Sequence, residues 1–198
     1  MPEYGHAHGQ LTAPDTLRFE RQLPGPLARV WSYLLDPGLR CRWLAGGDID
    51  PCEGGHATLV FRNAGLSSGD DRAPDKYREH ENAGMVQGRI IVCEPPRLLV
   101  MTWTDHADAP SVFDSEVSFE LTAHGDANGA DGNGAGARVH LVLTHARLHA
   151  GELGSVAAAW HTHLGLLDDQ LHGRAPRPFW RTHARMEAEY LALGIGTA

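Results

Sequence analysis

Three polar side chains fall at positions where the pattern of apolar residues predicts a buried environment. Ser115 interrupts an apolar strand face, His145 ends the inward row of another strand, and His163 flanks the apolar stripe of a long helix. A buried polar group needs a hydrogen-bond partner or a water. The three groups could orient a carbonyl or hydroxyl of a ligand, and either histidine could act as a general base near pH 7. Alternatively, a neighbouring backbone carbonyl satisfies each of them.

Other patterns that carry chemistry are weak in this chain. His161 and His163 do not share a helix face, whereas metal ligands on a helix favour i, i+4 spacing. The acidic tract within 124–137 lacks the ligand spacing of a calcium loop. The sequence has no Gly-rich phosphate loop, no Gly-x-Ser-x-Gly motif and no C-x-x-C pair among its three cysteines. We therefore predict no metal, no cofactor and no catalytic residue.

The helix that positions His163 is predicted from apolar spacings of 3, 4, 4, 3 and 4 over residues 153–171. At roughly 100° per residue these side chains lie within about 40° of the central tryptophan. The stripe consists of Leu153, Val156, Trp160, Leu164, Leu167 and Leu171. A large apolar surface must cover it, and the preceding strands are the candidate.

Alternating apolar and polar residues predict an antiparallel sheet with one dry face. Strands are expected at 17–23, 48–52, 56–63, 85–93, 97–104, 112–122 and 138–145. Two short helices, 27–35 and one ending near residue 43, follow the first strand, and an amphipathic helix at 179–193 closes the chain. This order predicts an α+β fold in which a curved antiparallel sheet of about six strands wraps around the long C-terminal helix.

The expected domain organisation is simple. Residues 1–15 are predicted to be a loose tail, and 16–173 the folded domain. Within that domain, 64–83 is a polar insertion, forming either a loose loop or a short surface helix, and 124–137 is a flexible hairpin loop. Residues 174–198 form a helical extension expected to pack back on the domain.

Composition limits the classes of partner. The net charge of −8 gives no general attraction to nucleic acid or anionic membranes. The longest apolar runs fall far short of a membrane span, and the first residues do not resemble a signal peptide. We expect a cytoplasmic protein that binds neither nucleic acid nor membrane, as a monomer or homodimer.

Several segments together resemble a known family. They include the segments 17–21 and 30–31, the strand–corner–strand unit 88–103 with Glu94-Pro95-Pro96, the strand end 143–145 and the helix segment 159–167. The chain resembles the bacterial branch of the family named for the activator of the heat-shock-protein-90 ATPase, within the START-like, birch-pollen-allergen-like (SRPBCC) superfamily. The resemblance covers about residues 16–173 and implies a helix-grip fold. Relatives in this superfamily carry lipids, bind secondary metabolites or cyclise polyketides, so the fold alone does not choose a function.

A sheet that grips a helix can leave a cavity between them. The alternative is that the same side chains simply fill the core. The predicted ligand-binding residues are Phe61, Met101, Trp103, Phe113, Ser115, Phe119, His145, Trp160, His163 and Leu164.

Three functions fit these observations. The first is non-catalytic binding of a small hydrophobic or aromatic molecule in the cavity. The second is a protein-interaction or chaperone-regulating domain that uses its outer surface and the 64–83 insertion. The third is a cyclase or hydrolase that uses His145 or His163 as a base. We favour binding, then interaction, then catalysis.

Overall fold

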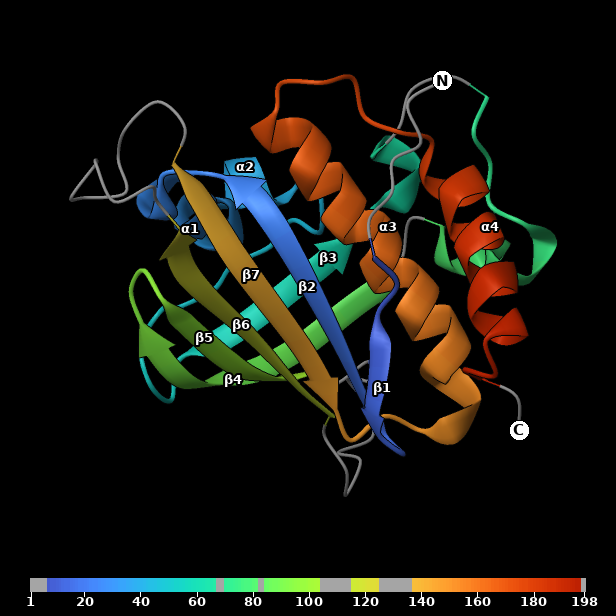
Figure 1. Ribbon diagram of the computed structural model, residues 1–198, viewed down its shortest axis with the longest axis horizontal. Coiled ribbons are helices and arrows are strands. Elements are labelled where there is room, and N and C mark those ends of the chain that lie inside the picture. Colours follow the sequence, from blue (N-terminus) through green and yellow to red (C-terminus); the bar gives the residue numbers. More distant parts are fainter. Residues whose placement is uncertain (1–6, 67–69, 82–83, 104–114, 125–136, 197–198) are drawn as a thin grey trace.

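A seven-stranded antiparallel sheet forms one layer of the structure, in the order β1-β2-β7-β6-β5-β4-β3. The structure is a computed structural model, and it describes residues 7–66, 70–81, 84–103, 115–124 and 137–196. The strands are β1 (Gln10–Ala13), β2 (Thr16–Pro24), β3 (His56–Phe61), β4 (Gly84–Glu94), β5 (Leu98–Trp103), β6 (Ser115–His124) and β7 (Arg138–Ala146). The long helix α3 (Leu153–Leu171) lies across this sheet (Figure 1), which confirms the α+β helix-grip fold.

The sheet contains one strand that the sequence does not predict, because β1 lies in the segment expected to be a loose tail. Leu11 pairs with Leu17, and Gln10 pairs with Arg18, in antiparallel register. All four residues of β1 are exposed, so the apolar alternation that reveals a half-buried strand is missing there. Gly9, just before β1, donates its backbone N–H to the hydroxyl of Tyr190 over 2.7 Å.

The predicted strand at 48–52 does not form. Isolated bridges join Gly46 to Val60 and Ile49 to Ala57, and the chain then turns, with the Cys52 N–H donating to the Asp50 carbonyl. Pro51 lies within the predicted strand and has no N–H to donate to a ladder, which stops the pairing beyond the bridge at Ile49.

Two helices connect β2 to β3, as predicted. Helix α1 (Leu27–Leu35) has the predicted bounds and buries Val30, Trp31 and Leu34. Helix α2 (Pro37–Arg40) is a single turn, shorter than expected, and the Asp36 carboxylate accepts from the backbone N–H groups of its first turn. The α2 segment matters to the site because it leads directly to Trp43 and Leu44, both buried.

Helix α3 is buried on more than its apolar stripe. Residues on its other faces, including His161, Leu166 and Asp169, are also buried. The reason is α4 (Phe179–Ala192), which packs along α3 on the side away from the sheet (Figure 1). Gly173, at the end of α3, has a φ of 65°, which is the left-handed conformation that ends helices and favours glycine.

The polar insertion is built from 3₁₀ turns in the part of it that the structure describes. These are η1 (Asn63–Gly65) and η2 (Asp75–His80), and a third turn, η3 (Ala150–Glu152), precedes α3. Tyr77 of η2 stacks on Trp180 with ring centroids 5.9 Å apart, so the insertion packs against α4. Among the described residues, no helix is long and apolar enough to cross a membrane.

Candidate functional site

A cavity of about 580 Å³ lies between the sheet and the N-terminal half of α3. Its size falls within the range of small-molecule sites. Aromatic and aliphatic side chains make up most of its wall. It is lined by Leu44, Phe61, Asn63, Gly84, Met85, Val86, Trp103, Ser115, His145, Leu148, Glu152, Val156, Ala159, Trp160 and His163.

Six of the predicted ligand-binding residues line this cavity: Phe61, Trp103, Ser115, His145, Trp160 and His163. Met101, Phe119 and Leu164 do not line it and are fully packed in the core. The Phe119 ring meets Trp160 edge-on, with centroids 5.9 Å apart, so it supports the cavity wall from behind. Phe113 lies outside the described residues.

The aromatic wall is a continuous cluster. Trp103 and Trp160 lie 5.3 Å apart between ring centroids, and Phe61 meets Trp103 at 6.0 Å. The His163 ring lies next to two members of this cluster. Its centroid is 6.0 Å from that of Phe61 and 6.4 Å from that of Trp160. Such rings give a ligand a large apolar contact area with defined stacking geometry.

His145 is held by hydrogen bonds at both ring nitrogens. The Trp160 indole N–H donates to its Nδ1 over 2.9 Å, and its Nε2 lies 2.9 Å from Ser115 Oγ. Because an indole N–H only donates, Nδ1 is the bare nitrogen and Nε2 carries the proton. Ser115 Oγ in turn donates to the Trp103 backbone carbonyl over 2.8 Å. The chain therefore runs from Trp160 through His145 and Ser115 to Trp103.

This arrangement keeps His145 neutral. Burial lowers its pKa to about 3, since the imidazolium would lose its hydration. A general base needs a free acceptor nitrogen and a pKa near the working pH. Because the Trp160 indole N–H occupies Nδ1, His145 has no free acceptor nitrogen. Its role is to hold the Trp160 ring in the cavity wall.

His163 is held at one nitrogen only. Its Nδ1–H donates a hydrogen bond to the Trp43 backbone carbonyl over 2.7 Å. Burial lowers the pKa of His163 to about 4, with a smaller opposing effect of the hydrogen bond to Trp43. Its Nε2 has no hydrogen-bond partner among the described residues. It is therefore an unsatisfied acceptor on a residue that lines the cavity.

Comparison with known proteins identifies the family. The sequence model of the family "Activator of Hsp90 ATPase homolog 1-like protein" matches residues 24–172. The chain belongs to this family. The sequence resemblance to the family of the heat-shock-protein-90 ATPase activator is thereby confirmed.

Solved structures agree with this membership. A Bordetella parapertussis protein is 38% identical, with a TM-score of 0.71, and the match covers 94% of this chain and 90% of that one. CalU16 from Micromonospora echinospora is 24% identical with a TM-score of 0.62, covering 90% and 87%. A protein of unknown function from Enterococcus faecalis is 15% identical with a TM-score of 0.60, covering 96% and 91%. The latter two show the fold alone. A search of curated proteins finds none that matches.

Several cavity residues of this member of the Hsp90 ATPase activator-like family escape the sequence analysis. Leu44 follows a short helix, Asn63 belongs to η1, and Glu152 belongs to η3, so none lies in a periodic pattern that predicts its direction. Val156 and Ala159 could have been found, because they lie four residues and one residue before Trp160 on α3. The helix stripe marked Val156 as core without placing it in the cavity wall.

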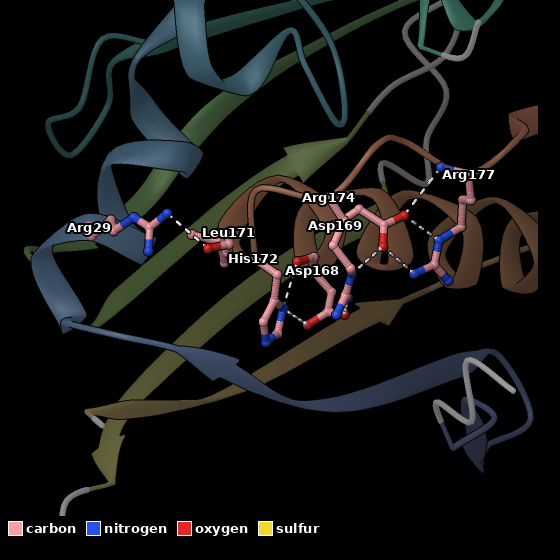
Figure 2. Close-up of polar contacts among 7 residues, drawn as sticks. All are labelled: Arg29, Asp168, Asp169, Leu171, His172, Arg174 and Arg177. Atoms are coloured by element: carbon pink, nitrogen blue, oxygen red, sulfur yellow. Dashed lines mark hydrogen bonds and ion pairs between the residues drawn. The ribbon is translucent and has the colours of Figure 1, made fainter. Parts of the chain in front are cut away.

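A second polar cluster lies at the C-terminal end of α3 in this family member (Figure 2). The Asp169 carboxylate accepts from Arg177 Nε at 2.8 Å and Nη2 at 3.0 Å, and Arg174 reaches both Asp168 and Asp169. Each carboxylate faces guanidinium groups, which fixes the turn between α3 and α4. In the part of the chain that the structure describes, no group of three His, Cys, Asp or Glu side chains could hold a metal ion.

Proposed function

We propose that this protein binds a small hydrophobic or aromatic molecule in the cavity between the sheet and α3, without chemical conversion. The observation that carries the proposal is the aromatic cavity of about 580 Å³, walled by Phe61, Trp103 and Trp160. Its volume lies within the roughly 300–1,000 Å³ of known ligand sites, and its wall combines aromatic and aliphatic side chains with polar groups.

The state of the two cavity histidines supports binding over catalysis. Both ring nitrogens of His145 are hydrogen-bonded, to Trp160 and to Ser115. Burial lowers its pKa to about 3. His163 spends Nδ1 on the Trp43 carbonyl, and its pKa is lowered to about 4. At pH 7 both are neutral and too weakly basic to take a proton efficiently, because an effective general base has a pKa near the working pH.

Tryptophan fluorescence and thermal unfolding test this function. Trp103 and Trp160 lie in the wall, so an aromatic ligand in van der Waals contact should change the emission. A ligand at one hundred times its Kd stabilises the folded state by about 2.7 kcal/mol, which raises Tm by several degrees. If a panel of hydrophobic and aromatic compounds shifts neither signal, the proposal is wrong.

A matched pair of variants separates cavity binding from surface binding. Ala159 lines the cavity, whereas Ala188 is exposed on α4. Ala159→Phe adds a ring to the cavity and should abolish the thermal shift. Ala188→Phe adds the same ring to the surface and should leave the shift unchanged.

Family membership favours one second candidate, regulation of a chaperone ATPase. The match to the Activator of Hsp90 ATPase homolog 1-like family over residues 24–172 is the observation behind it. The purified chain should then stimulate the ATPase of a bacterial heat-shock-protein-90 homologue in a concentration-dependent way. Absence of stimulation at a severalfold molar excess would exclude this candidate. We propose a cytoplasmic location for both functions, which cell fractionation tests.

A further inference from the structure

The polar groups in the cavity wall differ in how much of their hydrogen-bonding capacity is used. The Trp160 indole N–H and both nitrogens of His145 are engaged with each other and with Ser115. The Ser115 hydroxyl donates to the Trp103 carbonyl. A ligand therefore cannot bond to His145 without breaking this chain.

His163 is the exception. A backbone carbonyl only accepts, so the 2.7 Å contact with the Trp43 carbonyl places the proton of the neutral ring on Nδ1. Nε2 then carries a lone pair, and no donor for it lies in the described part of the chain. His163 is 3% exposed and lines the cavity, so a molecule bound in the cavity can supply the missing donor.

Asn63 also lines the cavity, and its Oδ1 is buried with no hydrogen-bond partner among the described residues. The amide of Asn63 carries N–H donors as well, so the acceptor that calls for a ligand donor is Nε2 of His163.

We propose that the ligand is an aromatic or polycyclic alcohol whose hydroxyl donates its hydrogen bond to Nε2 of His163. This inference rests on the proposed function and specifies the ligand class. An ether, ketone or carboxylate of the same shape brings lone pairs against the bare Nε2. A hydroxyl satisfies the nitrogen and keeps its own oxygen available as an acceptor.

Three probes of nearly equal shape test the class: naphthalene, 1-naphthol and 1-methoxynaphthalene. Their Kd values are measured by titration calorimetry on the full chain at pH 7.5. One hydrogen bond to a buried acceptor should make 1-naphthol bind about tenfold tighter than 1-methoxynaphthalene. Naphthalene should resemble the methyl ether, because neither can donate.

The variant His163→Asn isolates the nitrogen concerned. The Asn amide N–H can replace Nδ1 in donating to the Trp43 carbonyl, while the Nε2 acceptor is removed. The variant should then bind 1-naphthol and 1-methoxynaphthalene with about equal Kd values. His124→Asn is the matched control, because it makes the same change at an exposed histidine of β6 that does not line the cavity. It should leave the tenfold preference intact.

A spectroscopic readout keeps the test independent of variant folding. In the wild type, the ¹⁵N resonance of His163 Nε2 should be that of a bare nitrogen, and 1-naphthol should shift it upfield whereas 1-methoxynaphthalene should not. If all three probes bind equally well, the ligand class is wrong and cavity binding stands. If the preference survives in His163→Asn, the assignment to Nε2 is wrong. If no probe binds, the inference fails together with the proposed function.

Discussion

The indole N–H of Trp160 donates to Nδ1 of His145 over 2.9 Å, and this bond joins α3 to β7 inside the cavity wall. The two side chains come from facing layers of the fold, and both are almost fully buried. The same bond fixes the tautomer of His145 and the direction of the Trp160 ring. This hydrogen bond between helix and sheet therefore contributes, together with the ring contacts of Trp160, to the shape of the cavity.

Replacing Trp160 should measure this bond. Trp160→Phe removes the donor and leaves Nδ1 of His145 buried and unpaired, which costs about 1–3 kcal/mol beyond the loss of apolar contact. Urea unfolding followed by circular dichroism gives the free energy of unfolding.

Trp180 offers a matched control for this measurement. It is 4% exposed, against 3% for Trp160, but its buried Nε1 has no hydrogen-bond partner among the residues that the structure describes. Trp180→Phe loses similar volume without losing a hydrogen bond, so it should cost about 1–3 kcal/mol less than Trp160→Phe. Equal losses would show that the bond to His145 contributes nothing.

Stability should fall as the pH decreases below about 6.5. Burial lowers the pKa of His163 to about 4, so between these two values the unfolded chain binds a proton that the folded chain does not. The stabilisation from neutral His163 is present above the unfolded pKa and is lost as the pH approaches the folded pKa. The slope is about 1.4 kcal/mol per pH unit for each such group.

His163→Asn removes this titration and serves as the test. Urea unfolding of wild type and variant at several pH values from 7.5 to 4.5 gives two profiles. Their difference should change by about 1.4 kcal/mol per unit in the lower part of this range. Parallel profiles would mean that His163 titrates alike in the folded and unfolded states.

The sequence predicts the elements whose patterns are local. Phe119 and Leu121 alternate with Ser118 and Glu120, and this period of two fixes the inward face of β6. The helix over 27–35 follows from Pro26 before it and Pro37 after it, since proline suits the start of a helix and stops its continuation. Such signals lie within about ten residues, so no tertiary structure is needed to interpret them.

The features that sequence reasoning misses depend on contacts between distant segments. Strand β1 has no buried face, and the neighbouring Gly9 reaches Tyr190 across 181 residues of chain. The cavity residues Asn63 and Glu152 belong to short 3₁₀ turns without periodicity. For the site, the periodic pattern found His145, Trp160 and His163, but it could not show that Met101 and Leu164 fill the core instead.

The buried ion pair at the end of α3 should be essential to stability (Figure 2). The side chains of Asp169 and Arg177 are 1% and 8% exposed. Asp169→Asn removes the charge that faces a buried guanidinium, and breaking a buried pair in this way costs about 3–5 kcal/mol. Arg185→Ala is the control, since its contact with Glu189 is exposed and long, at 3.7 Å, and should change stability by less than about 0.5 kcal/mol. Similar Tm values for the two variants would contradict the prediction.

Asp71 should anchor α4 from a distance of more than one hundred residues along the chain. Its carboxylate accepts from the backbone N–H groups of Trp180 at 2.8 Å and Arg181 at 3.1 Å, in the first turn of α4. Pro178, the residue before the helix, provides no side-chain cap of its own. Asp71→Ala leaves these N–H groups unpaired and removes a negative charge from the helix N-terminus, which should cost about 1–2 kcal/mol.

Hydrogen exchange can locate the effect of Asp71→Ala. The amides of the first turns of α4 should lose protection, while those of β6 and β7 should change only by the global loss of stability. Asp70→Ala provides the control, because Asp70 is exposed and adjacent in sequence. It should leave exchange in α4 unchanged, and equal loss of protection in both variants would show that Asp71 has no specific role as a cap.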